Sequence, residues 1–226
     1  MKILYLLQLS LCLCVVSVHA APVLIGPDKV DLDLPKGYCA LSRADPSDVR
    51  LIRFLEDSNK GVNQVISIFA DCEQLPSWRS GLLDSLNDYG YILTPISSIK
   101  QRYDLSNEKF VAELLKVFKK QGVEFLDKGI DNAVKNIEEH FPISKLNETK
   151  NLGVIATDNN ALYWALTQKL VTETGENKNI AGVMAMTLVG GKSINLYLWR
   201  TYEGGRTIYD LEANTSAWVY HTVQKN

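Results

Sequence analysis

The sequence is poor in the residues that build metal centres and thiol active sites. Among its 226 residues are four cysteines and three histidines, and two of the cysteines, Cys12 and Cys14, fall within the first twenty positions. Beyond that segment the histidines are His140 and His221, which are distant from each other and from the remaining cysteines. Because zinc sites draw their ligands from closely spaced pairs, we predict no metal site and no cofactor.

The sequence also lacks clustered positive charge. Its formal net charge is −2 at pH 7, whereas a protein that binds a phosphate backbone gathers Lys and Arg on one surface. The densest group, Lys116, Lys119 and Lys120, has the spacing of the solvated face of a helix. We therefore exclude nucleic acid as a partner, and the partner stays an unknown protein or small ligand.

Long apolar runs are missing everywhere except at the N-terminus. Lys2 precedes an apolar stretch over residues 3–18, and small residues before Ala21 suit cleavage. This pattern is typical of a secretory signal peptide over residues 1–20, and the stretch is shorter than the roughly 20 residues of a spanning helix. We expect residues 21–226 to form a single exported α/β domain, periplasmic or secreted, with no stable membrane span after cleavage.

Two alternatives for the N-terminus stay open. The apolar stretch could be retained as a membrane anchor, or Cys12 or Cys14 could carry a lipid. Leu11 and Leu13 argue against the lipid, since a lipoprotein signal has a small residue before its cysteine.

Cys39 and Cys72 are the cysteines that follow the predicted signal peptide. An even count in an exported chain favours a disulfide, and closing a loop of this length contributes about 3.5–4 kcal/mol on chain-entropy grounds. The alternative makes Cys72 a nucleophile with a histidine base. Its neighbours Asp71 and Glu73 argue against that role, because a thiolate requires positive surroundings. We predict a Cys39–Cys72 disulfide.

Hydrophobic periodicity predicts an α/β (α+β) fold in which helices flank an antiparallel sheet. Asp45-Pro46-Ser47-Asp48 has the residues that begin a helix, and Gly61 can end it. Turn residues separate the last four predicted strands, which should form a meander. Strands are expected at Val30–Leu34, Asn63–Asp71, Tyr89–Ile96, Leu152–Asp158, Ala161–Thr172, Ile180–Val189 and Ser193–Thr201. Further helices are expected at Leu75–Gly81, from Ser106 to Gly122, through Leu126–Phe141 and after Gly204-Gly205.

Several short motifs suggest chemistry but are incomplete. Gly190-Gly-Lys-Ser193 is similar to the end of a phosphate-binding loop, yet a second Gly is missing and a strand follows, so a hairpin turn is predicted. Asp158-Asn-Asn160 lacks the rest of a calcium loop and predicts a turn. Glu138-Glu139 has the position of a solvated helix face, and no sharp turn presents a serine nucleophile. The catalytic residues, if there are any, stay unknown.

Two further features of the sequence are a group of aromatic residues and two glycosylation sequons. Four aromatic residues lie along the predicted meander, and they indicate either core packing under a helix or an exposed patch for a ligand. These residues are Trp164, Tyr197, Trp199 and Tyr202. Asn147-Glu-Thr149 and Asn214-Thr-Ser216 match glycosylation sequons, which matter only in a source that glycosylates exported proteins.

Two stretches carry a resemblance to a known family. Leu34-Pro-Lys-Gly-Tyr38 resembles the opening of PsbP-like proteins. The run Ala181–Trp199, followed by a helix through Trp218-Val219, is similar to their last hairpin and helix and to the ending of uncharacterised exported bacterial proteins. The resemblance implies an α/β/α sandwich around an antiparallel sheet, with a non-enzymatic binding or assembly role. It implies no catalytic residues, and the cysteine pair lies outside the shared pattern.

These observations favour an exported, disulfide-stabilised binding or assembly protein of the cell envelope. One alternative is a hydrolase whose site is assembled in three dimensions. Another is a secreted, host-directed effector or inhibitor, which differs from the first hypothesis only in its destination.

Overall fold

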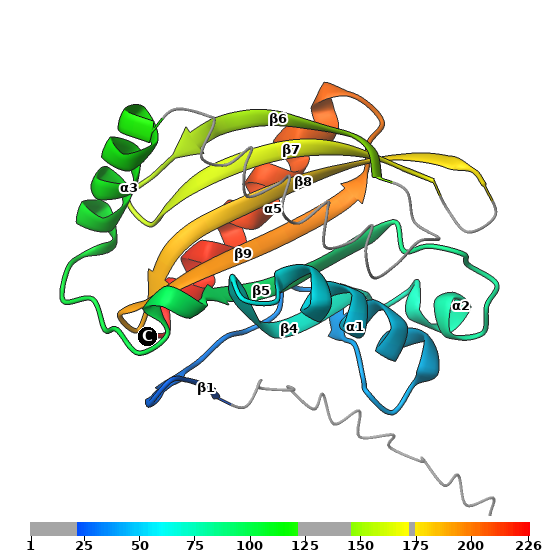
Figure 1. Cartoon of the computed structure of the whole chain (residues 1–226), viewed down its shortest axis with the longest axis horizontal. Helices are drawn as coiled ribbons and strands as arrows, with labels where there is room; N and C mark the ends of the chain where they lie inside the picture. The colour runs from blue at the N-terminus through cyan, green and yellow to red at the C-terminus, as the bar shows by residue number, and fades with distance from the viewer. Residues whose placement is uncertain (1–21, 122–145, 172–174) are drawn as a thin grey trace, which may run out of the picture.

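The computed structural model describes residues 22–121, 146–171 and 175–226 (Figure 1). The predicted signal peptide over 1–20 and the predicted helix through Leu126–Phe141, with Glu138, Glu139 and His140, lie outside the described residues. The strands are β1 Val23–Ile25, β2 Asp28–Val30, β3 Tyr38–Ala40, β4 Asn63–Asp71, β5 Asp88–Pro95, β6 Leu146–Thr157, β7 Ala161–Val171, β8 Asn177–Val189 and β9 Lys192–Thr201. The helices are α1 Pro46–Asn59, α2 Leu75–Arg79, a short 3-10 turn η1 Ile96–Ser98, α3 Asn107–Gln121 and α5 Gly205–Gln224.

Seven of the strands form one antiparallel sheet in the order β3-β4-β5-β9-β8-β7-β6, and β1 and β2 form a separate hairpin. Strands β6 to β9 follow one another in space as they do in sequence, so they are the predicted meander. Helix α5 covers one face of the sheet, while α1 and α3 lie on the other (Figure 1). The α+β fold class, an antiparallel sheet between helices, is confirmed.

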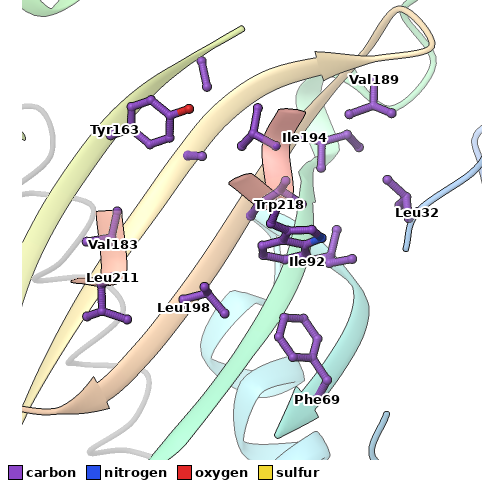
Figure 2. Close-up of a cluster of buried hydrophobic side chains, with 14 of the residues drawn as sticks. Leu32, Phe69, Ile92, Tyr163, Val183, Val189, Ile194, Leu198, Leu211 and Trp218 are labelled. Atoms are coloured by element: carbon purple, nitrogen blue, oxygen red, sulfur yellow. The ribbon is translucent and has the colours of Figure 1, made fainter. Parts of the chain in front are cut away.

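The face of the sheet under α5 holds the largest apolar cluster. Leu211, Trp218 and Val219 of α5 pack against inward-pointing residues of the strands (Figure 2). The Trp218 ring meets the Phe69 ring edge-on at 5.3 Å between centroids, and its indole N–H donates to the carbonyl of Asp33 at 2.7 Å. Helix α5 is therefore joined both to the sheet and to the segment that leads into it.

Two glycines let aromatic rings lie flat on the sheet. A Cβ atom on Gly182 would lie 2.7 Å from the Trp199 ring, and one on Gly90 would lie 2.6 Å from the Phe69 ring. In each case the aromatic residue is the direct cross-strand partner of the glycine. Such distances are shorter than any van der Waals contact, so a larger residue at either position requires the ring to move.

Three strand predictions are wrong in their extent, one of them for β8, which begins at Asn177 and not at Ile180. The sheet does not include Val30–Leu34: β2 ends at Val30, and Leu32 is buried against the α5 core without strand pairing. The apolar residues of this segment alternate because one side of it is buried against the core, and not because it pairs with a strand of the sheet. Strand β6 begins at Leu146, earlier than the predicted Leu152, because the polar residues between Leu146 and Leu152 show no apolar alternation that would predict a strand.

Candidate functional site

The predicted disulfide is formed between Cys39 of β3 and Cys72, the residue after β4. The Cα atoms are 5.0 Å apart, and the Cys72 N–H donates to the carbonyl of Gly37 at 2.9 Å. Because both sulfur atoms are used in this bond, the interpretation of Cys72 as a nucleophile is wrong. The disulfide fixes the loop that leads from the sheet into α2.

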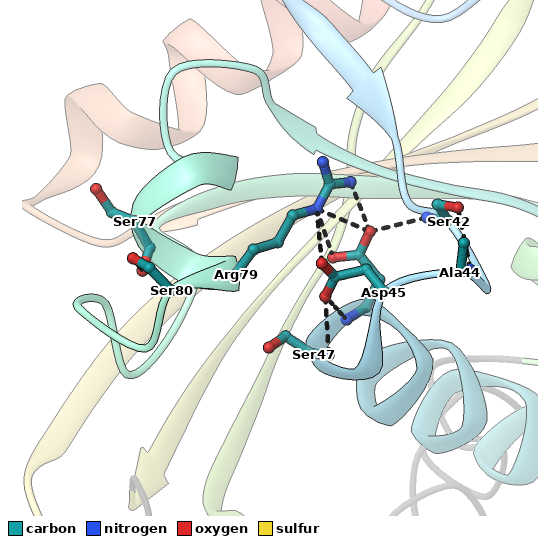
Figure 3. Close-up of polar contacts among 8 residues, drawn as sticks. Ser42, Ala44, Asp45, Ser47, Ser77, Arg79 and Ser80 are labelled. Carbon is teal, nitrogen blue, oxygen red and sulfur yellow. Dashed lines mark hydrogen bonds and ion pairs between the residues drawn. The ribbon is translucent and has the colours of Figure 1, made fainter.

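A buried carboxylate joins α1 to α2. Asp48, in the first turn of α1, has no exposed surface. Arg79, at the end of α2, donates to both carboxylate oxygens, with its terminal nitrogen 2.6 Å from Oδ2 (Figure 3). The backbone N–H of Ser42 donates to the same Oδ2 at 2.8 Å. This hydrogen bonding raises the pKa of Arg79.

Asp45 is the N-cap of α1, as its sequence predicts. Its carboxylate accepts from the backbone N–H groups of Ser47 at 2.9 Å and Asp48 at 3.4 Å, and its second oxygen lies 3.9 Å from Arg79 (Figure 3). The free N–H groups at the start of α1 are thus already satisfied.

Beside this network lies a pocket of about 440 Å³. Its walls come from the first two turns of α1, from α2 and from the loop that follows. The lining residues are Pro46, Ser47, Arg50, Trp78, Gly81, Leu83 and Asp84. This volume falls in the range of small-molecule sites, about 300–1,000 Å³.

An aromatic ring and a cation form one side of the pocket. The guanidinium carbon of Arg50 lies 5.4 Å from the centroid of the Trp78 ring, within the range of a cation–π contact. Trp78 is 7% exposed, and its indole N–H is buried with no hydrogen-bond partner among the described residues. Leu82, between the lining residues Gly81 and Leu83, is 84% exposed.

The lining offers recognition chemistry and no complete catalytic set. It contains one hydroxyl, one guanidinium and one carboxylate beside an indole, but no histidine that could act as a base for Ser47. Among the residues that the structure describes, no three His, Cys, Asp or Glu side chains are placed to hold a metal ion. The arrangement can bind a small molecule through opposite charges and an apolar wall.

Lys192 of the Gly190–Ser193 motif has a structural role. The glycines form the predicted hairpin turn between β8 and β9, with φ of 56° and 78°. The ammonium group of Lys192 is 1% exposed and donates to the carbonyls of Ile99 at 2.9 Å and Gln101 at 2.8 Å. It also pairs with Asp28 at 2.9 Å; the hydrogen bond from Lys192 lowers the pKa of Asp28. All three protons are used within the protein.

Asp158 likewise serves the turn that was predicted for it. Its carboxylate accepts from the backbone N–H groups of Asn160 at 2.7 Å and Ala161 at 2.8 Å, and from the Tyr163 hydroxyl at 2.7 Å. These contacts close the β6–β7 turn and tie it to the core.

Three of the four meander aromatics share the face covered by α1 and α3. Trp164, Met184, Tyr197 and Tyr91 are successive cross-strand partners along one row. Trp164 and Trp199 are each 4% exposed, and burial raises the pKa of Tyr197. Tyr202 lies beyond the end of β9 and is 36% exposed. Core packing therefore accounts for the two tryptophans, and the four residues do not form one exposed patch.

The remaining histidine, His221, lies in the last turn of α5, where its ring is 5.9 Å from the Tyr220 ring. It is exposed, and α5 packs on the opposite face of the sheet from α1. A histidine-dependent site at the pocket is therefore not built by this residue.

Comparisons of the chain with protein-family models, with curated proteins and with solved structures find no match. Within residues 22–121, 146–171 and 175–226, none of the helices combines the length and apolar character needed to cross a membrane. The function is therefore argued from the site.

Sequence patterns missed the pocket and the ion pair that frames it. The helix start at Asp45 and the short helix at Leu75 were both predicted, but nothing in either stretch shows that Asp48 pairs with Arg79, 31 positions later.

Proposed function

We propose that this chain is an exported binding protein of the cell envelope, with PsbP-like architecture, and that it binds its ligand in the pocket between α1 and α2. The pocket carries the proposal because it combines an aromatic wall, two opposite charges and a volume suited to a small ligand. The predicted signal peptide and the disulfide support export, since disulfides persist in oxidising compartments.

The pocket is held in shape before any ligand arrives. The disulfide fixes the entry to α2, and the Asp48–Arg79 pair fixes the exit of α2 against the first turn of α1. A site whose walls are already ordered loses less conformational entropy on binding.

Mass spectrometry of the protein from the exported fraction tests the proposal. Under denaturing conditions the wild-type chain should begin at Ala21 and weigh two hydrogens less than its reduced form. Under native conditions it should retain a small-molecule adduct. The double variant Arg50→Gln, Asp84→Asn should lose the adduct.

The matched control is the double variant Arg206→Gln, Asp210→Asn, which changes the same residue types on the exposed surface of α5, where the two side chains lie 3.9 Å apart. It should keep the adduct. An adduct that survives the pocket substitutions, or no adduct at all, overturns the assignment of the pocket. A chain found uncleaved in the cytoplasm overturns export.

A further inference from the structure

One of the two glycosylation sequons lies on the outer surface of the fold. Asn214-Thr-Ser216 is part of α5, and Asn214 is exposed there. Among the residues that the structure describes, none forms a hydrogen bond with the Asn214 side chain. The side chain of Asn147, in the other sequon, lies outside the described residues. The amide of Asn214 is therefore free to carry another group.

The surroundings of Asn214 leave room for a large substituent. Its neighbours on a helix lie three and four positions away, and on the outer side of α5 these are Asp210 and Ala217. Both are exposed, as is the adjacent Ala213. An N-linked glycan is bulky and hydrophilic, so it suits a surface position of this kind. A sugar on Asn214 extends into solvent without displacing a core residue.

The packed helix does not present this sequon to a transferase. The sequon is defined by the Asn amide together with the hydroxyl two positions later, which the enzyme has to bind as one unit. In α5 the middle residue, Thr215, has no exposed surface, and its hydroxyl donates to the carbonyl of Leu211 at 2.7 Å. The Ser216 hydroxyl is turned to Asp158, 3.4 Å from its carboxylate. The sugar therefore has to be attached before α5 packs on the sheet.

We propose that Asn214 is an N-glycosylation site, modified during export and before α5 packs on the sheet. The amide nitrogen forms a bond to the anomeric carbon of an oligosaccharide that a polyprenyl diphosphate carries. The bond from that carbon to the diphosphate oxygen breaks, and polyprenyl diphosphate leaves with the electron pair. The amide proton passes to a base of the transferase, and nothing is oxidised or reduced. This inference rests on export in the proposed function and not on the pocket.

The glycan and the pocket lie on opposite sides of the sheet. Helix α5 covers one face, whereas α1, whose first turns line the pocket, packs on the other (Figure 1). The sugar therefore shields the outer surface of α5 and leaves the pocket open. Enzymatic removal of the glycan should leave the native adduct unchanged.

Secretion of the full chain from cultured animal cells tests the inference. The variant Asn147→Gln is used throughout, so that the other sequon does not contribute. The exported protein should migrate faster on a denaturing gel after treatment with an N-glycan amidase. Because this enzyme converts the modified asparagine to aspartate, peptide mass spectrometry should find aspartate at position 214.

Substitutions within the sequon identify the acceptor. Asn214→Gln should lose the glycan completely. Ser216→Ala keeps the amide but removes the hydroxyl of the sequon, and it should lose the glycan as well. The matched control is Ser216→Thr, which keeps the hydroxyl and should keep the glycan. Melting temperatures equal to that of the deglycosylated Asn147→Gln protein establish that the variants are folded.

The outcomes separate this inference from the proposed function. An exported chain that begins at Ala21 and carries no glycan at position 214 overturns the inference and leaves export standing. A glycan that persists in Ser216→Ala also overturns it, because the sequon then does not direct the attachment. An uncleaved chain without glycan in the cytoplasm overturns both. A native adduct that is lost when the glycan is removed contradicts the separation of the sugar from the pocket.

Discussion

Two regions of this molecule hold their shape by different means. The meander β6–β9 under α5 shares an apolar cluster that extends across the sheet to Phe69 and Ile92. The corner formed by α1, α2 and the loop to β5 has a small cluster of its own, whose buried members are Ala70, Leu75, Trp78 and Leu86. The corner adds a disulfide and a buried ion pair.

This difference explains where the pocket lies. A close-packed apolar layer fills its own space, since interiors reach crystal-like density. A corner held by a few strong, localised links can keep a polar concave surface open between its elements. The meander side holds the largest apolar cluster, and the corner holds the pocket.

The largest expected effect removes the apolar contact of α5. Trp218→Ala should lower the free energy of unfolding by about 3–5 kcal/mol, because Trp218 is 3% exposed and packs on Phe69. Urea denaturation of the oxidised protein measures this free energy. The control variant Tyr220→Ala, at a position 54% exposed in the same helix, should change the free energy of unfolding by less than about 0.5 kcal/mol. Similar losses for both variants would show that α5 is not held by its inner face.

The second-largest effect is expected from removing the disulfide. Replacing both Cys39 and Cys72 by Ser should lower the free energy of unfolding by about 3.5–4 kcal/mol, because the unfolded chain regains the entropy of an open loop. Hydrogen exchange should lose protection mainly in β3 and the first turn of α1, with β8 less affected. A reductant should destabilise the wild-type protein and leave the double variant unchanged. Uniform loss of protection would contradict the separation of the two regions.

A smaller loss in the free energy of unfolding is expected from breaking the ion pair. Arg79→Gln leaves the Asp48 carboxylate buried without its charge partner, which should lower this free energy by about 3 kcal/mol. This value is at the lower end for buried pairs because the arginine side chain is 33% exposed. Adding Asp48→Asn to Arg79→Gln should cost less than the sum of the two single changes. Additive losses in thermal unfolding would mean that the two side chains act independently.

The smallest effect is a dependence on pH at the junction of the two regions. Lys178 of β8 donates to Ser85, Leu86 and Asn87 in the loop after α2, and burial lowers its pKa to about 8. The unfolded chain therefore binds more protons between pH 8 and the ordinary lysine value of about 10.4, so stability should rise with pH across this window.

The measurement compares the wild-type protein with Lys178→Met, to remove the contributions of other titrating groups. The difference in free energy of unfolding between the two should move in favour of the wild type as the pH rises from 8 to about 10.4. A difference that stays flat would show that the lysine keeps its ordinary pKa in the folded protein.

The sequence was most informative where one local rule decides the structure. Strand β4 has the predicted limits, Asn63–Asp71, because its run of β-branched and aromatic residues favours an extended strand. Asp45 and Pro46 begin α1 as predicted, since the N-cap contacts are made within three residues. Local signals of this kind do not depend on the rest of the fold.

The sequence was least informative about contacts between residues far apart in the chain and about the edge of the sheet. The contact of Arg50 with Trp78 spans two helices, and a pocket is a property of their relative placement, which no periodicity encodes. The edge strand β6 contains bulges that shift its pairing register with β7 at three places, namely Leu146/Glu148, Asn151/Gly153 and Val154/Ala156. Each shift interrupts the alternation of inward and outward side chains along the strand. The cysteine pairing could be predicted because just two cysteines, Cys39 and Cys72, follow the predicted signal peptide.

Because α5 follows every strand of the sheet in the chain, it is the last of these elements to be synthesised. A ribosome releases all seven strands of the sheet before α5, yet α5 supplies Leu211, Trp218 and Val219 to the core. Until its 20 residues emerge, the apolar side of the nascent sheet lacks its contacts with α5. Synthesis therefore includes an interval in which this side of the sheet is incompletely buried and accessible to chaperones.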